Sequence, residues 1–352
     1  MKTIVESFGR FDEKDVSAYT ITNDHGMEMT CINYGCVITK IMVPDADGKV
    51  ENVVLGFDSV EDYVKKSPYF GCIVGRVAGR IAGGEFELDG HVYKLAKNDG
   101  NNHLHGGIRN FSNTVWDAEL IEKQEEASVI FTYTSPDGEE GYPGTVKATV
   151  TYTLNNKNEI RMEYKATTDK TTIINLTNHT YFNLSGDLKR DILDHTLTMK
   201  SDRFLELKED LIPTGRFLDV EGTPFDFRNG RKIRDGAVSD HVQNKIAGNG
   251  YDHPFLLNEG EGEKIVLQDE ESGRMIAVET DQPAVVLYTG NQLENNFSIR
   301  GTSSRKYLGL CLETQGLPDA IHHPHFPSCV LHKGETYKAS TIFTFGVLQR
   351  KK

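Results

Sequence analysis

The stretch Thr145-Val-Lys-Ala-Thr-Val-Thr-Tyr-Thr-Leu154 decides the fold class, because every second side chain from position 146 onward is apolar. In an extended strand, alternate side chains point to opposite faces, so this segment would bury one face and expose threonine and lysine on the other. Residues 159–166 repeat the alternation, and the polar residues 155–158 between the two segments make a short connection. The pattern predicts a β-hairpin with one buried face.

Period-two patterns continue along the chain. Phe86-Glu-Leu-Asp-Gly-His-Val-Tyr93 predicts a tighter hairpin, since Asp89-Gly90 suits the positive φ angles of a two-residue type I′ turn. Residues 44–48 and 135–144 are rich in Pro, Gly and Asp and mark further reversals. The remaining strand candidates are 274–280, 284–289, 307–314 and 341–347.

Helical signals are sparse. Ser59 could cap a helix of about two turns over residues 59–64, with Asp62 at the third helical position. Strands and helices do not alternate as a parallel sheet requires. We therefore predict a mostly antiparallel all-β protein, either a large sandwich or a barrel, with few short helices. No repeat, linker or low-complexity tract divides the chain, and we expect one domain over residues 1–352.

Composition narrows the function classes. The chain has 39 Lys+Arg against 52 Asp+Glu, a net charge of −13, which repels phosphate backbones and argues against nucleic-acid binding. No segment approaches eighteen consecutive apolar residues, so we expect no membrane span. The first ten residues lack the apolar region of a secretory signal, and the five cysteines contain no Cys-x-x-Cys pair. We expect a cytoplasmic protein with buried thiols, whose basic tail at 350–352 is a solvated end.

The stretch Asn175-Leu-Thr-Asn-His-Thr-Tyr-Phe-Asn-Leu184 carries the strongest functional signal. Read as one strand, it places five polar or hydrogen-bonding side chains on one face: Asn175, Thr177, His179, Tyr181 and Asn183. Such a row is expected opposite an apolar face only where water or a polar ligand meets it. A lone strand histidine is usually structural, but the central place of His179 in this row favours a site.

A carboxylate in an apolar strand is the second signal. In Leu308-Gly-Leu-Cys-Leu-Glu-Thr314, the leucines share one face and Glu313 lies on the other, with Cys311. A buried carboxylate is costly without partners, so Glu313 should face a polar cavity. A structural ion pair is an equally good reading of this segment alone.

Two further segments offer polar groups. The glycine-rich residues 75–84 match neither a Walker A loop nor a dinucleotide-binding turn, but Arg76 and Arg80 within them are candidates for contacts to oxygen ligands. His103 and His105 are two apart, so a strand would present both to one face, for a metal or for a polar ligand. Gly106 and Gly107 would let the backbone turn sharply behind His105.

Residues 321–326 contain three histidines, which raises the question of a metal site. A proline interrupts this cluster, and no carboxylate stands at the spacing of a zinc-binding helix. An exposed polar loop is the better interpretation.

Taken together and in order, these segments are specific. Besides Asn175–Leu184, the sequence contains Ile32-Asn-Tyr-Gly35, Val53-Val-Leu-Gly-Phe-Asp58, Leu104-His-Gly-Gly107, Tyr251-Asp-His253, Tyr288-Thr-Gly-Asn291 and Leu312-Glu-Thr-Gln315. With these motifs the chain resembles the aldose 1-epimerase, or galactose mutarotase, family over nearly its whole length. The resemblance implies the large antiparallel super-sandwich of that family.

The resemblance also implies an activity and a site. It implies an isomerase of carbohydrate metabolism that interconverts the α and β anomers of aldohexoses such as glucose and galactose. Glu313 would be the general base and His179 the general acid, and the sugar would be held by Arg80, His105, Tyr181 and Asp252. No cofactor and no metal is implied, and the protein would act as a monomer or homodimer on a monosaccharide.

Two positions depart from the family's pattern. Gly79 stands where asparagine often precedes the arginine, and Val286 stands where a glutamine is often found. Both departures remove hydrogen-bonding side chains near the sugar, so they bear on hydroxyl specificity and leave the acid–base pair intact.

The chemistry explains these residue types. Opening a hemiacetal needs a base for the C1 hydroxyl and an acid for the ring oxygen, and each contributes about 10²–10⁴-fold in rate. An ordinary glutamate is ionised at neutral pH. We expect carboxylates such as Asp252 to favour the charged imidazole of His179.

Three other functions are alternatives to this one. A non-catalytic sugar-binding or regulatory protein would keep the cavity and lose His179 or Glu313. A hexose-6-phosphate mutarotase would need basic residues near the phosphate. A glycosidase would use two carboxylates, such as Asp252 and Glu313, and would leave His179 without a role.

Overall fold

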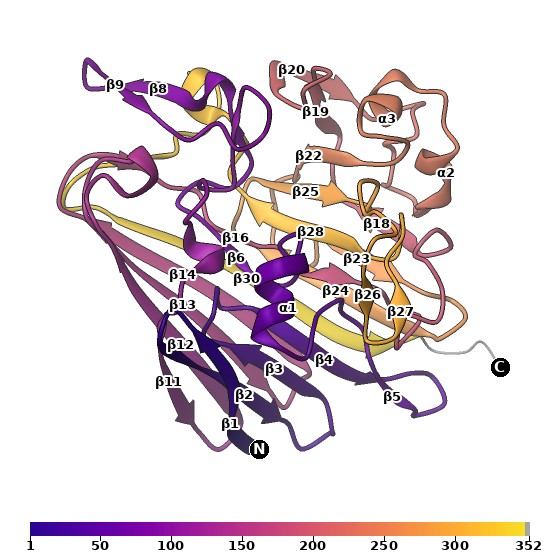
Figure 1. Ribbon diagram of the computed structural model, residues 1–352. Helices are drawn as coiled ribbons and strands as arrows, with labels where there is room; N and C mark the ends of the chain where they lie inside the picture. Colours follow the sequence, from indigo (N-terminus) through magenta and orange to yellow (C-terminus); the bar gives the residue numbers. More distant parts are fainter. Residues whose placement is uncertain (349–352) are drawn as a thin grey trace.

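The computed structural model describes residues 1–348, and strands make up most of its regular structure (Figure 1). The basic tail at 350–352 lies outside the described residues. The prediction of an all-β protein with few short helices is confirmed, and all the strand pairs of the three large sheets are antiparallel.

The largest sheet has nine strands. In spatial order they are β11 (Asp117–Glu122), β12 (Glu126–Ser135), β13 (Val146–Asn155), β14 (Glu159–Thr168), β30 (Thr336–Val347), β24 (Arg274–Thr280), β23 (Ile265–Gln268), β18 (Thr196–Met199) and β21 (Arg231–Lys232). The hairpin predicted first is β13–β14. The strand β30 joins the two halves of the sheet, since it pairs with β14 on one side and β24 on the other (Figure 1).

A six-stranded sheet and a five-stranded sheet complete the architecture. The first is β17 (Tyr181–Phe182), β28 (Leu310–Gln315), β25 (Ala284–Tyr288), β22 (Asp252–Leu256), β19 (Arg203–Leu207) and β20 (Pro213–Asp219). The second is β1 (Lys2–Phe11), β2 (Lys14–Thr22), β3 (Glu28–Ile32), β4 (Ile38–Pro44) and β5 (Val50–Asn52).

Short pairs of strands and short helices lie around these sheets. The pairs are β6 (Ile73–Val74) with β16 (Thr177–Asn178), β7 (Arg80–Ile81) with β10 (His103–Leu104), β8 (Glu85–Leu88) with β9 (His91–Lys94), β15 (Thr172–Ile173) with β29 (Val330–Leu331), and β26 (Ser298–Ile299) with β27 (Thr302–Ser303). The α-helices are α1 (Val60–Lys66), α2 (Arg234–Ala237) and α3 (Val242–Ile246). None of the helices in residues 1–348 has the length and apolarity to span a membrane.

The core lies between the sheets. Ile41 of β4, Val150 of β13 and Leu312 of β28 belong to one cluster of buried apolar side chains, although they come from three different sheets. Each fully buried aliphatic or aromatic side chain contributes about 1.5–3 kcal/mol. Sheets packed face to face over a shared core are a β-sandwich, which decides between the two architectures left open by the strand pattern.

Local signals in the sequence hold in the structure. The side chain of Ser59 accepts a hydrogen bond of 3.2 Å from the backbone N–H of Asp62 and so caps α1. Asp89 and Gly90 have φ angles of 51° and 76° in the β8–β9 turn. All five cysteines are free thiols, and all except Cys329 are buried.

The prediction of one continuous strand over residues 175–184 is wrong. The segment contains only the two-residue strands β16 and β17, and both of its sets of side chains are buried. Four of the five polar side chains bind backbone: Asn175 pairs with Gly316, and Thr177, Asn183 and Tyr181 donate to the carbonyls of Thr314, Leu308 and Pro68. Most of these bonds fasten the segment beside β28, which leaves His179 and Tyr181 facing a cavity.

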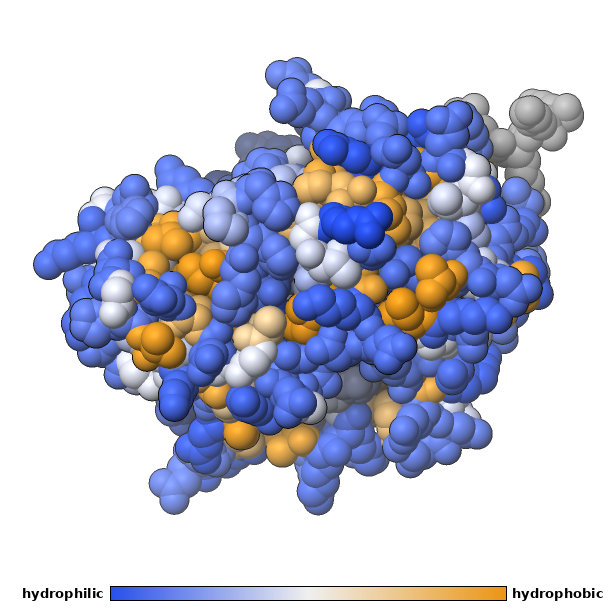
Figure 2. Space-filling model, turned by 90° about the horizontal axis from the view of Figure 1, so that it is seen from above, coloured by the Kyte–Doolittle hydropathy of each residue, from blue (hydrophilic) through white to orange (hydrophobic). Residues whose placement is uncertain are grey.

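The surface seen from above is mostly hydrophilic, with hydrophobic residues in separate patches (Figure 2). This agrees with the acidic composition and the low mean hydropathy of −0.45.

Candidate active site

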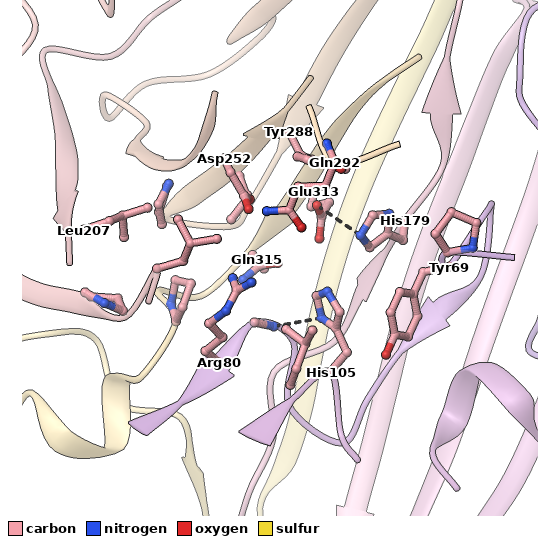
Figure 3. A pocket seen from close by; sticks show the side chains of 18 of the residues that line it. Tyr69, Arg80, His105, His179, Leu207, Asp252, Tyr288, Gln292, Glu313 and Gln315 are labelled. Carbon is pink, nitrogen blue, oxygen red and sulfur yellow. Dashed lines mark hydrogen bonds and ion pairs between the residues drawn. The ribbon is translucent and has the colours of Figure 1, made fainter. Parts of the chain in front are cut away.

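One pocket brings the candidate residues together. It has a volume of about 210 Å³, and its lining includes residues from the segment that carries β7 and β10 and from the strands β19 and β20. Its lining includes all six residues that the family resemblance implies: Arg80, His105, His179, Tyr181, Asp252 and Glu313. Figure 3 labels five of them, all except Tyr181.

His179 and Glu313 face each other in this pocket. Nε2 of His179 lies 3.6 Å from Oε1 of Glu313, and the two side chains are only 5% and 4% exposed (Figure 3). Glu313 belongs to β28, where the alternation sends Leu312 into the core and Glu313 into the pocket. Because both groups are so nearly enclosed, their charges are strongly affected by burial.

The ring of His179 stacks with two tyrosine rings. It is nearly parallel to the ring of Tyr69 at 5.7 Å and to that of Tyr181 at 5.1 Å, each with an interplanar angle of 24°. Its backbone N–H donates to the carbonyl of Cys72, and its carbonyl accepts from the N–H of Gly71. The imidazole therefore has a fixed plane, with Nε2 directed at Glu313.

Burial dominates the electrostatics of the pair. It raises the pKa of Glu313 well above the usual value, and the charge of Asp252 raises it further. It lowers the pKa of His179 to about 4, although a contact with the backbone of the same residue opposes the shift. The expectation that nearby carboxylates favour a charged imidazole is therefore wrong, since desolvation is the larger effect. A carboxylic acid beside a neutral imidazole is the favoured form of this pair.

His105 presents a donor to the pocket. The backbone N–H of Gly79 donates a hydrogen bond of 3.1 Å to Nδ1 of His105, so the proton of the neutral ring sits on Nε2. Burial lowers the pKa of His105 well below its usual value, and the neighbouring His179 contributes. The ring is therefore a neutral N–H donor.

His103 does not share this role. It is fully buried, with Nδ1 at 2.7 Å from the carbonyl of Ala96 and Nε2 at 2.6 Å from the hydroxyl of Tyr142. The prediction that both histidines share one face is wrong, because the strand ends after Leu104 and His105 takes a left-handed φ of 51°.

Arg76 and Arg80 also lie in different surroundings. Nε of Arg80 lies 2.6 Å from Oδ2 of Asp99, and this ion pair positions Arg80 at the pocket. Arg76 is buried elsewhere and donates to the backbone carbonyls of Ser135, Pro136 and Pro143. The candidacy of Arg76 is therefore wrong, since its donors are used to hold a loop.

The pocket also has the residue types of a metal site. One ligand atom each of His105, His179 and Glu313 lie within 4.8 Å of one another. A metal on Nε2 of His105 would require the loss of the proton that the bond from Gly79 keeps there, or the loss of that bond. The donor set therefore suits hydrogen bonding to a polar ligand better than coordination of a metal.

In the histidine cluster of residues 321–326, one histidine contacts a nearby carboxylate. Nδ1 of His322 contacts Oδ1 of Asp319 at 2.6 Å within a short 3₁₀ turn.

The sequence interpretation missed several residues at this site. Tyr69, Gln292 and Gln315 line the pocket, and Asp99 positions Arg80. Gln315 could have been found, because it is two positions beyond Glu313 on the same strand and so faces the same side. Tyr69 has a φ of 68° and reaches the pocket from a loop, which no periodic pattern predicts.

The two departures from the family's pattern both fall here. Gly79 has a φ of 76°, and a Cβ at this position would lie 2.9 Å from Cβ of Pro318, so the site is tight. Val286 pairs with Glu313 across neighbouring strands and adds an apolar patch to the wall.

Comparisons with known proteins agree on one relationship. The sequence model of the family described as aldose 1-epimerase matches residues 17–344. The galactose mutarotase of Bos taurus is 43% identical over 335 residues, covering 94% of each chain, and the aldose 1-epimerase of Escherichia coli (strain K12) is 37% identical over 332 residues, covering 93% of this chain and 94% of that one. The crystal structure of the galactose 1-epimerase from Lactobacillus acidophilus NCFM superposes with a TM-score of 0.89 at 35% identity, covering 99% of both chains.

Proposed function

The chain belongs to the aldose 1-epimerase family, and we propose that its pocket interconverts the α and β anomers of aldohexoses such as glucose and galactose. The protein is accordingly an isomerase of carbohydrate metabolism. The observation that carries the proposal is the 3.6 Å approach of His179 to Glu313 inside a small pocket. A sugar bound there would meet a proton donor and a proton acceptor at once.

Glu313 acts as the general base and His179 as the general acid. The carboxylate of Glu313 takes the proton of the C1 hydroxyl, Nε2–H of His179 gives a proton to the ring oxygen, and the bond between C1 and that oxygen breaks. Rotation about the C1–C2 bond turns the other face of the aldehyde toward the C5 hydroxyl. Closure then returns each proton, with the roles of the two groups reversed.

The proton count of the pair supports this sequence. The reaction starts from an ion pair, with Glu313 as the carboxylate and His179 as the charged imidazole. This ion pair holds the same number of protons as the uncharged pair that burial favours. A single proton transfer between Nε2 and Oε1, which lie 3.6 Å apart, therefore converts one pair into the other. After ring opening, Glu313 is protonated and His179 is neutral. Burial therefore stabilises the protonation state of the open-chain stage and makes His179 a ready proton donor.

The other four residues bind and orient the sugar. Arg80 and the Nε2–H of His105 donate to hydroxyl oxygens, and Asp252 accepts from hydroxyls. Tyr181 forms a wall and keeps the plane of the neighbouring imidazole, while its own hydroxyl donates to the carbonyl of Pro68. With a donor on one side and an acceptor on the other, the pyranose is held in one orientation.

The proposal needs no cofactor, because the reaction moves only protons. We propose that residues 1–352 act as one domain in the cytoplasm, as a monomer or homodimer. The net charge of −13 supports a neutral monosaccharide as the ligand in place of a nucleic acid.

Polarimetry on freshly dissolved α-glucose and α-galactose tests the function. The protein should speed the approach to anomeric equilibrium for at least one of these sugars. Glu313→Gln keeps the shape of the side chain without the base, so the rate should fall by about 10²-fold or more. Glu163→Gln, an exposed change on β14, is the matched control and should leave the rate unaltered. Full turnover by the Glu313 variant would refute the assigned role.

A further inference from the structure

A buried thiol contacts the nitrogen of His179 that faces away from Glu313. Cys311 lies two residues before Glu313 in β28, so the two side chains share a face of the strand. Its Sγ lies 3.4 Å from Nδ1 of His179, and the cysteine is fully buried. The imidazole therefore has Glu313 at one nitrogen and a sulfur at the other.

The neighbours of Nε2 decide where the imidazole protons sit. In the uncharged pair, the O–H of Glu313 needs an acceptor, and Nε2 of His179 is the nitrogen that faces it. In the ion pair, both nitrogens are protonated. Nδ1 thus carries a hydrogen in both states, and that hydrogen needs an acceptor. Cys311 supplies the sulfur at this position.

Building on the proposed function, we propose that Cys311 is a positioning residue whose sulfur accepts a hydrogen bond from Nδ1–H of His179 and so keeps Nε2 as the nitrogen that exchanges protons in the pocket. A histidine whose second nitrogen is bound by a partner has a fixed tautomer and ring orientation. The stacked rings of Tyr69 and Tyr181 fix the plane of the imidazole, but a rotation by half a turn would leave that plane unchanged. The sulfur at Nδ1 and Glu313 at Nε2 together distinguish the two orientations, and only the sulfur contact engages Nδ1–H.

A sulfur also suits an acid better than a carboxylate would. A carboxylate at Nδ1 raises the basicity of an imidazole and stabilises its charged form, as in hydrolases whose histidine begins as a base. A thiol that stays protonated is a weak, uncharged acceptor, and burial raises the pKa of the Cys311 thiol well above its usual value. The contact therefore orients His179 without opposing the release of its proton.

Nitrogen-15 NMR of histidine-labelled protein at neutral pH tests the tautomer directly. The signals of His179 are assigned by their loss in His179→Gln. The wild type should show a protonated Nδ1, Cys311→Ala should shift the ring toward the Nε2–H tautomer or a mixture, and Cys311→Ser should retain Nδ1–H because a hydroxyl also accepts. A wild-type ring with its proton on Nε2, or an unchanged Nδ1–H tautomer in Cys311→Ala, would overturn the proposal.

Kinetics supply the second readout. Cys311→Ala should lower kcat by about tenfold with little change in KM, and Cys311→Ser should recover most of that loss. Cys31→Ala removes a buried thiol from β3, remote from the pocket lining, and controls for the cavity that such a change leaves. Thermal unfolding of each variant identifies any loss due to misfolding. Full activity of His179→Gln would instead refute the acid–base assignment, whatever the NMR shows.

Discussion

The backbone N–H of Gly79 donates to Nδ1 of His105, and this bond gives His105 a different task from its neighbour His179. The rings of the two histidines are 5.3 Å apart and nearly perpendicular. His105 is left with a fixed Nε2–H donor, whereas Nε2 of His179 faces a carboxylate with which it can exchange a proton.

The two histidines should therefore respond differently to the same substitution. His105→Gln should raise KM by about 3- to 10-fold, the value of one hydrogen bond of about 0.5–1.5 kcal/mol, and leave kcat nearly unchanged. His179→Gln should lower kcat by about 10²-fold or more. Steady-state polarimetry separates the two constants, and equal losses of kcat in both variants would contradict the division of roles.

The loss of activity on the acid side of the pH profile should occur at an unusually low pH. The working pair holds one proton, and a second proton enters at His179, whose pKa burial lowers to about 4. On the acid side, the ratio kcat/KM should thus decrease only as the pH approaches 4. The alkaline limb should report the raised pKa of Glu313, where the pair loses its proton. A loss of activity centred near pH 6.5, after correction for the uncatalysed rate, would show an ordinary histidine.

Glu313 should also make the protein less stable at neutral pH. Its pKa is higher in the folded protein than in the unfolded chain, so the folded state holds more protons as the pH rises above about 4.5. Stability is then lost with rising pH until the folded pKa is passed. Glu313→Gln should unfold at a higher temperature than the wild type at pH 7, and the difference should shrink toward pH 4. A constant difference across this range would show that the carboxylate is not the cause.

Asp99 should influence substrate binding although its role is to hold another side chain. Asp99→Asn weakens the 2.6 Å ion pair with Nε of Arg80, so KM should rise by about 3- to 10-fold with kcat preserved. Asp117→Asn, an exposed change on β11, should have no effect. An unchanged KM in the Asp99 variant would mean that Arg80 keeps its position unaided.

The turn behind His105 should tolerate no side chain. Gly106 has a φ of 85°, and a Cβ there would lie 1.9 Å from the carbonyl oxygen of Gly75. Gly90 has a similar φ of 76° but nothing within 4 Å of its Cβ position. Gly90→Ala should cost only the left-handed backbone penalty of about 1–2 kcal/mol, whereas Gly106→Ala should cost more and raise KM by displacing His105. Denaturant unfolding of the two variants measures the contrast.

Much of the fold is predictable because it follows from local sequence patterns. The alternation in β13 and β14, the Asp89-Gly90 turn and the Ser59 cap each act within a few residues. Glu313 was predictable for the same reason, since its strand buries leucines on the opposite face.

The residues that could not be predicted depend on contacts distant in sequence. The amide of Asn175 looks like a ligand-binding group, but it pairs with the backbone of Gly316, which lies on a segment that no local pattern places beside it. The low pKa of His179 likewise comes from enclosure by the whole sandwich. A pattern read along one strand predicts which face a side chain takes, but it contains no information on what packs over that face.

The central place of β30 has a consequence for biosynthesis. The strands β11 to β14 are synthesised before β24 and can form a meander, because each pairs with its neighbour in sequence. The edge of β24 that pairs with β30 stays open until residues 336–347 have been synthesised. Until then the nascent chain exposes two open sheet edges, those of β14 and β24, each able to pair with another chain. The nine-stranded sheet therefore cannot be completed before β30 has been synthesised.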